Sequence, residues 1–308
     1  MTRLTVDDLA GIPADLPAYD AELESRTGCT LAALACRAAG VEERSLAERA
    51  GGVRVAVVPL DCGQGVLPGF AEAVRAVAAH LGFEAWVTAR ADAGGLAEAY
   101  GHGAGILTTA DEESFVAVNL TTRAVADDNE ATARGFVTAL ELLCARRGEE
   151  RARGGGGRFG ATAAAGAGLA GREVLVLGCG PVGRASARLL RARGARVSLC
   201  DTRSERARQA ARELAEAGGG AEVHVEEDLE AALFRHRLLL DATPAPRFIR
   251  ERHIRPETRV AAPGVPLGLT AGALRAVGPH LVHDPLQIGT AVMLLEALSG
   301  GARQGGRP

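Results

Sequence analysis

Short apolar runs alternate with stretches of helical apolar spacing along both halves of the chain. In the first half, the runs predict strands over Val53–Leu60, Glu84–Thr88, Ala104–Thr109 and Ser114–Leu120. The helical spacing predicts helices over Pro68–Leu81, Asp92–Tyr100 and Asp128–Arg147. Strands that alternate with helices are typical of a small α/β unit with a mostly parallel sheet.

The same alternation resumes in the second half, after residue 170. Strands are predicted over Val174–Leu177, Arg196–Cys200, Glu222–Val225, Leu238–Ala242, Arg259–Ala262 and His280–Asp284. Helices are predicted over Val182–Arg193, Ser204–Ala217 and Gly289–Leu298. This order indicates a doubly wound parallel sheet. The predicted fold class is therefore α/β, with a small α/β domain followed by a Rossmann-type domain.

A glycine- and alanine-rich stretch at residues 148–170 separates the two halves. Such a composition buries little apolar area, so it predicts a flexible linker or a surface excursion. The expected organisation is a first domain at residues 1–147, this linker, a second domain at residues 171–298 and a disordered tail at 299–308. At the amino end, Thr5 and Asp8 have the spacing of a capping box for a short first helix.

Composition narrows the chemistry more than it narrows the fold. All 35 basic residues are arginine, and the absence of lysine excludes Schiff-base catalysis, a P-loop lysine and a lysine general base. A net charge of −3 and an aromatic content of 3% argue against a nucleic-acid partner. Acids within the first ten residues argue against a signal peptide, and no apolar run is long enough to span a membrane.

Cysteine and histidine positions argue against disulfides and metal. Six cysteines are scattered without C-x-x-C pairs, which favours reduced thiols in the cytoplasm. His280 and His283 fall on a predicted strand, where residues three apart point to opposite faces of the sheet. No metal site is therefore expected.

A strand of apolar residues leads directly into Gly178–Gly183, whose sequence GCGPVG fits G-x-G-x-x-G. In a dinucleotide-binding unit, Gly178 would permit the tight turn, Gly180 would let the backbone approach a pyrophosphate, and Gly183 would let the helix pack closely. The next strand ends in Asp201, at the spacing of an acid that binds the adenine ribose. This context disfavours the alternative, a glycine-rich turn in a nucleotide-free domain.

Asp201 favours NAD over NADP, because a carboxylate accepts hydrogen bonds from a ribose diol and repels a 2′-phosphate. Arg203 leaves NADP open, since its side chain could clamp that phosphate instead of lying in solvent or stacking on adenine. Two later loops follow strand ends where such a sheet binds its ligand, although they could also be simple turns. The expected cofactor-binding residues are Gly178, Cys179, Gly180, Pro181, Val182, Gly183, Asp201, Thr202, Arg203, Ala242, Thr243, Pro244, Pro263, Gly264, Ile288 and Gly289.

Eight segments spread along nearly the whole chain resemble one family. They are LTVDDL, SRTGCTLAALACRAAG, VVPLDCGQGVLPGF, TTADEESFVAVNL, VLVLGCGPVG, DATP, VAAPGVP and DPLQIGTAVMLLEAL. In combination they resemble the NAD-dependent dehydrogenases of pyrrolysine biosynthesis. The glycine fingerprint alone fits many dehydrogenases, whereas the other segments are more particular to this family.

The resemblance implies an enzyme that uses NAD to oxidise the terminal amine of 3-methyl-D-ornithyl-N6-L-lysine, giving an imine or semialdehyde that cyclises. It implies a substrate-binding and catalytic first domain with a lid helix, an NAD-binding second domain, and a cytoplasmic homodimer. The substrate-binding residues that it implies are Leu4, Cys62, Val66, Phe70, Asp111 and Asn119. Leu4 and Asp111 are also the expected catalytic residues.

Each of these residues also has a structural interpretation. Asp111 could have a raised pKa and act as a base, remain ionised as counter-ion to the amine, or only cap the following turn. Leu4 could exclude water from the site or merely staple the first helix. Val66 and Phe70 could belong to the core, and Asn119 could bond backbone across a strand.

The sequence also departs from the family in two places. The linker looks longer than the family's, and Asp61-Cys62 stands where small hydroxyl residues are expected. Two other functions therefore stay open. One is an NAD-dependent dehydrogenase of another ornithine- or lysine-like amine, and the other is a non-catalytic NAD-sensing module.

Overall fold

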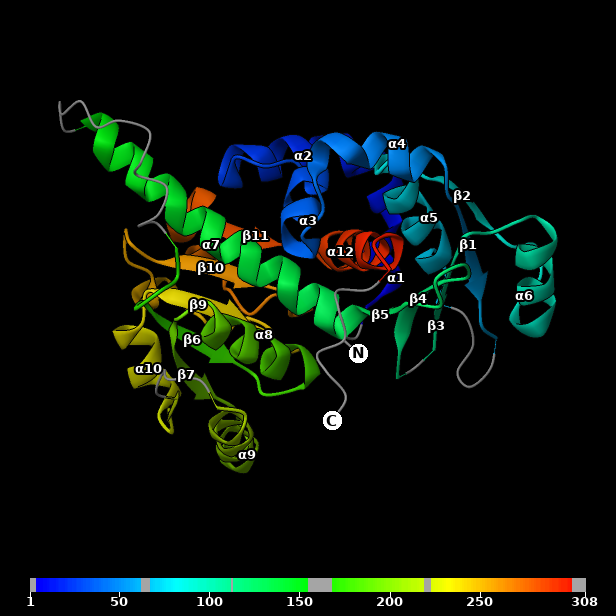
Figure 1. The fold of residues 1–308 in the computed structure, drawn as a ribbon. Coiled ribbons are helices and arrows are strands. Elements are labelled where there is room, and N and C mark those ends of the chain that lie inside the picture. Colours follow the sequence, from blue (N-terminus) through cyan, green and yellow to red (C-terminus); the bar gives the residue numbers. More distant parts are fainter. Residues whose placement is uncertain (1–3, 62–66, 112, 155–167, 219–222, 301–308) are drawn as a thin grey trace.

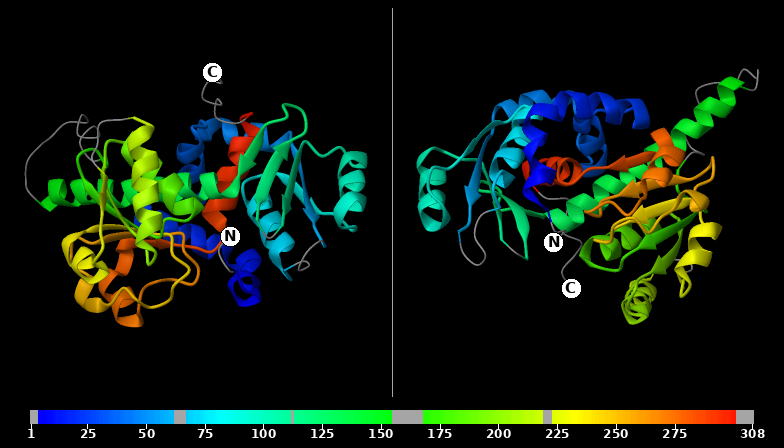
Figure 2. Two further views of the ribbon diagram at one scale, coloured as in Figure 1. Left: turned by 90° about the horizontal axis from the view of Figure 1, so that it is seen from below. Right: turned by 180° about the vertical axis from the view of Figure 1, so that it is seen from behind.

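Two sheets lie at opposite ends of the molecule, with helices between them (Figure 1; Figure 2). The computed structural model describes residues 4–61, 67–111, 113–154, 168–218 and 223–300, without the side chains of 146–154. The predicted α/β fold class is confirmed: both sheets contain parallel strands, and helices cover their faces.

The first sheet has five strands in the order β2-β1-β3-β4-β5. Their bounds are β1 Arg54–Pro59, β2 Glu84–Val87, β3 Ile106–Ala110, β4 Phe115–Asn119 and β5 Val125–Asp127. The pairs β1–β2 and β1–β3 are parallel, as the alternating pattern predicts. The pairs β3–β4 and β4–β5 are antiparallel, because the short connections between these strands leave no room for a crossover helix.

Helices cover both faces of this sheet, so its strand β1 is buried on both sides. Val55 and Val57 of β1 face the main core with α5 (Phe70–His80). Ala56 and Val58 face the opposite side, where α6 (Asp92–Gly101) packs. A strand buried on both faces reads as a continuous apolar run, which is why VRVAVVPL shows no alternation.

Four N-terminal helices complete the first half: α1 Val6–Ala10, α2 Ile12–Thr27, α3 Leu31–Ala39 and α4 Leu46–Gly51, with a 3-10 turn at Glu43–Ser45. The predicted capping box at Thr5 is confirmed. Its backbone N–H donates to Asp8 Oδ2 at 2.8 Å, and the Asp8 N–H donates to Thr5 Oγ1 at 3.4 Å.

The second sheet has six parallel strands in the order β11-β10-β9-β6-β7-β8. The strands are β6 Glu173–Leu177, β7 Arg196–Cys200, β8 Val223–Val225, β9 Leu238–Asp241, β10 Arg259–Ala262 and β11 Leu281–His283. The helices are α8 Pro181–Ala192, α9 Ser204–Glu216, α10 Leu229–Arg235 and α11 Ala271–Val277, with 3-10 turns at Glu251–His253 and Gly278–His280. The chain winds outward from β6 and then from β9, which is the Rossmann order.

Helix α7 (Asp128–Gly154) and helix α12 (Gln287–Leu298) join the two halves (Figure 1). The sequence predicted that α7 ends at Arg147, but it continues to Gly154 inside the expected linker. The residues that follow Arg147, including two further arginines and two glutamates, have adequate helix propensity up to the glycine run. Residues 155–167 lie outside the described part of the chain.

Helix α12 is buried from Gln287 to Ala297, which explains why its sequence is apolar on all sides. Although it follows the last strand of the Rossmann sheet, it packs against α3, α5 and α7 and against β4 of the first sheet. The two halves thus share one continuous apolar core, which runs from Leu9 to Ala297. Where they meet, side chains from both halves can line a common site.

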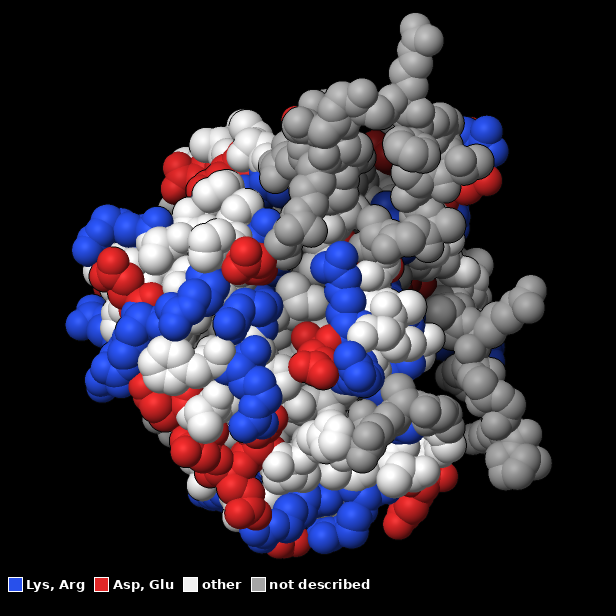
Figure 3. Space-filling model, turned by 90° about the vertical axis from the view of Figure 1, so that its left-hand side faces the viewer, with Lys and Arg blue, Asp and Glu red and all other residues white. Residues whose placement is uncertain are grey.

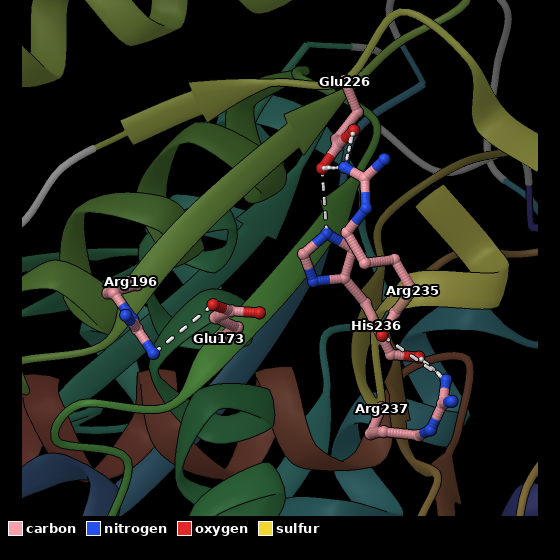
Figure 4. Close-up of polar contacts among 6 residues, drawn as sticks. All are labelled: Glu173, Arg196, Glu226, Arg235, His236 and Arg237. Carbon is pink, nitrogen blue, oxygen red and sulfur yellow. Dashed lines mark hydrogen bonds and ion pairs between the residues drawn. The ribbon is translucent and has the colours of Figure 1, made fainter. Parts of the chain in front are cut away.

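Charged residues of both signs alternate over the end of the molecule formed by the Rossmann sheet (Figure 3). Glu226 accepts hydrogen bonds from Arg235 Nη1 at 2.8 Å and from His236 Nε2 at 3.0 Å (Figure 4). Glu173 and Arg196 form an ion pair at directly paired positions of β6 and β7. Arg196 and Arg235 thus pair with acids, whereas Arg237 Nη1 donates to the backbone carbonyls of Phe234 and His236. Within the described residues, no helix combines the length and apolarity that crossing a bilayer requires.

Candidate functional site

A large cavity of about 710 Å³ opens where β6, β7 and β9 end. Its walls come from the glycine loop after β6, from residues Cys200–Arg206 after β7, and from Ala242–Ala245 after β9. The carboxyl edge of a doubly wound sheet is where such folds bind ligands, because the chain leaves the central strands in opposite directions there. We call this cavity the groove.

The three fingerprint glycines have the geometry that a dinucleotide requires. Gly178 has a positive φ of 85°, and a Cβ on Gly183 would lie 1.8 Å from the Gly178 carbonyl oxygen. A Cβ on Gly180 would meet no atom of the described chain within 4 Å, so the space above it is free for a ligand to approach the backbone. This is the division of roles expected for a turn, a close helix contact and a pyrophosphate site.

Asp201 lies on the wall of the groove at the end of β7. Its Oδ2 accepts a hydrogen bond from the Cys179 N–H, and its Oδ1 accepts one from the Arg203 N–H, both at 2.8 Å. These bonds hold the carboxylate in place against the glycine loop. Since two carboxylate oxygens offer about four lone-pair sites, the group can still accept hydrogen bonds from the hydroxyls of a ribose.

The loops after β9 and β10 are packed together by Asp241. Its buried carboxylate accepts from both the N–H and the Oγ1 of Thr243, at 3.1 and 2.7 Å, and burial raises its pKa to about 6. The Gly264 N–H donates to the Asp241 carbonyl at 2.9 Å, and a Cβ on Gly264 would lie 2.1 Å from the Thr243 carbonyl. Asp241 therefore holds in place the loop of Thr243, which is part of the wall of the groove.

A second, much smaller cavity of about 40 Å³ lies between the two halves of the molecule. Asn129 and Val182 line both this cavity and the groove, so the two spaces share a wall. Most of its lining is apolar, including Leu4, Phe70 and Phe115. We call it the inner cavity.

Two carboxylates from distant parts of the chain line the inner cavity. Asp128 begins α7 and accepts a hydrogen bond from Thr132 Oγ1 at 3.2 Å, and burial raises its pKa from 3.8 to about 7. Asp284 follows β11; its Oδ2 accepts from the Tyr19 hydroxyl at 2.7 Å and its Oδ1 from the Ile288 N–H at 3.2 Å. Burial raises the pKa of Asp284 as well.

Most of the expected cofactor-binding residues lie on one of the two cavities. Those on the groove are Gly178, Gly180, Pro181, Val182, Asp201, Thr202, Arg203, Ala242, Thr243 and Pro244. Val182, Pro263 and Gly289 line the inner cavity. The other four are Cys179, Gly183, Gly264 and Ile288, which are packed behind these walls; Ile288, for example, is fully buried against Gly135 of α7.

The expected substrate-binding residues are more scattered. Leu4 and Phe70 line the inner cavity, and the Phe70 ring meets Phe115 edge-on at 5.2 Å. Asn119 does not line either cavity: its Nδ2 donates to the Ala297 carbonyl, and its Oδ1 accepts from the N–H groups of Thr121 and Thr122. All three partners are backbone groups, as in the structural alternative, but they lie on α12 and in the turn after β4 and not across a strand. Cys62 and Val66 lie outside the described residues.

Asp111 is exposed at the turn after β3 and lines neither cavity. Its Oδ1 accepts hydrogen bonds from the N–H groups of Ser114 and Glu113, at 2.7 and 2.8 Å. These donors hold the pKa of Asp111 below its ordinary value. The expectation of a raised pKa is therefore wrong, because the carboxylate is solvated and hydrogen-bonded. The ionised counter-ion and the turn cap remain as interpretations.

Sequence reasoning missed Asp128, Asp284, Tyr19 and Thr132. Asp128 looked like an ordinary acid in the first turn of a helix, where acids are common. Asp284 had a signal, since it follows a parallel strand at the ligand-binding edge of the sheet. No pattern in the sequence indicated that the starts of α7 and α12 meet.

Thiol and metal chemistry have little support within the described ranges. The five described cysteines are free, and burial raises the pKa of Cys179 to about 12. His283 Nδ1 lies 2.7 Å from the Ala262 carbonyl. In the part of the chain that the structure describes, no three His, Cys, Asp or Glu side chains gather as a metal site would require.

Comparison with known proteins agrees with the sequence resemblance. Residues 8–126 match the family described as "Pyrrolysine biosynthesis protein PylD, N-terminal domain". The pyrrolysine synthase of Methanosarcina acetivorans is 26% identical over 97% of this chain and 100% of its own length. The chain is similar to the pyrrolysine-biosynthesis family. A second pyrrolysine synthase, from Methanosarcina barkeri, is 25% identical over 97% of this chain and 98% of its own length.

Among solved structures, the chain is similar to a ligand-free 5-ketofructose reductase of Gluconobacter sp. strain CHM43. The TM-score is 0.51 at 16% sequence identity, and the match covers 80% of this chain and 93% of the reductase. This likeness concerns the fold, and it agrees with the α/β architecture described above.

Proposed function

We propose that this protein is a dehydrogenase of pyrrolysine biosynthesis, which uses NAD to oxidise the terminal amine of 3-methyl-D-ornithyl-N6-L-lysine. The observation that carries the proposal is the wall that the groove and the inner cavity share at Asn129 and Val182. A dinucleotide along the groove would have its reactive end close to a small, mostly apolar cavity that contains carboxylates. The names of the Methanosarcina relatives, both pyrrolysine synthases, support pyrrolysine as the product.

The residues of the groove fit a dinucleotide. The free space at Gly180 suits the pyrophosphate, and the start of α8 points its N–H groups toward it. Asp201 suits the ribose diol and would repel a 2′-phosphate, which favours NAD over NADP. When bound, the nicotinamide would supply the hydride acceptor; the protein binds, orients and desolvates the substrate.

The amine end of the substrate suits the inner cavity in size and chemistry. A volume of about 40 Å³ is only a little more than one water molecule occupies in the liquid, ~30 Å³, so it accommodates the amine end alone. Oxidation removes a hydride from the carbon and a proton from the nitrogen, leaving an iminium. Attack by the ornithine α-amine then closes the ring and releases ammonium. The apolar walls at Leu4 and Phe70 would keep water from competing for the iminium.

The test is to incubate the purified protein with the dipeptide and either NAD or NADP, and to follow the absorbance of the reduced cofactor. We expect turnover with NAD, weaker turnover with NADP, and a cyclised product in the mass spectrum. Reduction with lysine or ornithine but not with the dipeptide would instead indicate another amine as substrate. Cofactor binding without reduction by any of these amines would indicate an NAD-sensing module.

Two further properties belong to the proposal. We expect the protein to act in the cytoplasm, where NAD is available, and to form a homodimer. Sedimentation of the purified protein at several concentrations measures its mass, and a monomer at all concentrations would contradict the dimer.

A further inference from the structure

The inner cavity contains polar groups that the proposed reaction has not yet used. Asp128, Asn129, Thr132 and Asp284 line it among apolar side chains. A primary ammonium carries three N–H donors and requires acceptors when water is excluded. Two carboxylates on one small cavity that also borders the cofactor groove provide such acceptors at the place where hydride transfer would occur.

The two carboxylates are held differently. Asp284 accepts hydrogen bonds from the Tyr19 hydroxyl and the Ile288 N–H, which fix both of its oxygens. Asp128 accepts from the Thr132 hydroxyl, which is carried on the same helix one turn later. Asp284 is thus the more firmly oriented group. Among the described residues, the charged groups that act on Asp128 are Asp127, the last residue of β5, and Asp284, across the cavity.

We propose that Asp128 is the proton acceptor for the substrate's ammonium group, and that Asp284, oriented by Tyr19, is the counter-ion beside it. The inference rests on the proposed function. One proton passes from R–CH2–NH3+ to the Asp128 carboxylate and leaves the neutral amine R–CH2–NH2. When the carbon loses hydride, for which a bound nicotinamide would be the acceptor, the nitrogen lone pair forms the second C–N bond and R–CH=NH2+ results. Asp128 then returns the proton to solvent.

Other groups suit this role less well. The chain has no lysine, and Asp111 is exposed with a lowered pKa. Asp128 has a pKa of about 7, so it is ionised in a large fraction of molecules near neutral pH and still binds a proton firmly enough to accept one.

The first test compares kcat and KM of three isosteric variants. Loss of a general base typically costs 10²- to 10⁴-fold in rate, so we expect Asp128→Asn to lower kcat about 100-fold or more and to change KM less than about threefold. Asp284→Asn should raise KM about tenfold or more with a smaller loss of kcat. Asp15→Asn is the control: the charge change is the same, and the residue is exposed on α2 and lines neither cavity. It should keep at least half of the wild-type kcat.

The second test does not depend on turnover. Calorimetry of dipeptide binding without cofactor, in two buffers of different ionisation enthalpy, counts the protons released. At pH 6 the incoming ammonium should displace the proton of Asp128, so the wild type should release close to one proton and Asp128→Asn markedly less. Equal proton release by the two proteins would overturn the assignment.

The results separate this inference from the proposed function. If the wild type neither binds nor oxidises the dipeptide, the proposed function fails. If the wild type is active, Asp128→Asn keeps its kcat within about threefold and Asp111→Asn loses activity, then the function stands and Asp111 replaces Asp128. Circular dichroism of each variant shows whether it is folded before kinetics are compared.

Discussion

Buried carboxylates are the most informative single residues of this protein. Asp128, Asp241 and Asp284 all lie near the ligand-binding edge of the Rossmann sheet, and burial raises the pKa of each. Asp241 is used structurally, since it holds the loop of Thr243. Asp128 and Asp284 line a cavity, which is where a perturbed carboxylate is most often functional. The raised pKa values alone do not distinguish the structural role of Asp241 from the proposed roles of Asp128 and Asp284, but the positions of the three carboxylates do.

At this scale the stability of the protein should depend on pH. A carboxyl whose pKa is raised on folding binds its proton more tightly in the folded chain, so the free energy of unfolding falls as pH rises between the two pKa values. For Asp128 this interval runs from 3.8 to about 7. Urea unfolding between pH 4 and about 8 should show that Asp128→Asn loses part of this fall and is more stable than the wild type at the upper end. A variant less stable than the wild type there would contradict the raised pKa.

The fingerprint glycines give a second prediction at residue scale. The Cβ added in Gly180→Ala would meet no atom of the described chain within 4 Å, so the melting temperature of this variant should match that of the wild type. Its affinity for NAD should fall about tenfold or more, because the Cβ would occupy the space of the pyrophosphate. Gly183→Ala should lose both affinity and stability, because its Cβ would overlap the Gly178 carbonyl. Thermal melts and cofactor titration of the two variants check this. If Gly180→Ala bound NAD with the affinity of the wild type, the pyrophosphate would not lie at Gly180.

Among the helices, α1 and α3 are both N-capped by a threonine but have different surroundings. Thr5 caps α1, whose neighbour Leu4 lines the inner cavity, whereas Thr30 caps α3, which packs on α12 in the core. The first cap supports a wall of the site, and the second supports the fold.

Removing each cap should therefore have a different effect. A lost N-cap costs about 1 kcal/mol locally. Thr5→Ala should lower turnover severalfold with little change in melting temperature, since α1 is only five residues long and its one buried residue is Leu9. Thr30→Ala should lower the melting temperature by a few degrees and leave the turnover of folded protein unchanged. If the two variants lost equal stability, the cap at Thr5 would support the fold as the cap at Thr30 does, and α1 would not have the proposed role in the site.

Strands were the elements most predictable from the sequence. Apolar runs at β1, β3 and β6 are short, buried on both faces and bounded by breakers, so their position follows from composition alone. Helix α2 has a weaker signal, because it contains an internal proline, Pro17, and many polar residues. The full length of α7 was missed because its last turns lie in a segment that reads as a linker.

At the scale of the whole molecule, the sequence predicted many of the residues that line the groove, but for the inner cavity it predicted apolar wall residues such as Leu4 and Phe70 and missed the carboxylates. The fingerprint and Asp201 are local signals, and the structure places most of these residues together. The inner cavity arises where the first turn of α7 meets the start of α12 and Tyr19 of α2, and these segments are far apart in sequence. Their meeting depends on α12 crossing back to the first half, which the position of α12 in the sequence did not indicate.

The shared core has a consequence for the whole reaction. Because one apolar cluster runs through both halves, the groove and the inner cavity are set at a fixed separation by α7 and α12. Binding of NAD alone should thus stabilise the entire chain. At a concentration about 100 times the dissociation constant, linkage adds about 2.7 kcal/mol, so a single melting transition should shift upward by several degrees. Two transitions, with only one shifted, would indicate that the halves unfold separately.

The most direct test of the account is the stoichiometry of the reaction. Wild-type protein, excess NAD and a limiting amount of 3-methyl-D-ornithyl-N6-L-lysine are incubated to completion, and NADH, ammonium and cyclised product are measured in the same sample. We predict one NADH and one ammonium for each ring formed. A ring-free sample, or bound NAD without any NADH, would contradict the central claim that this chain is an amine dehydrogenase.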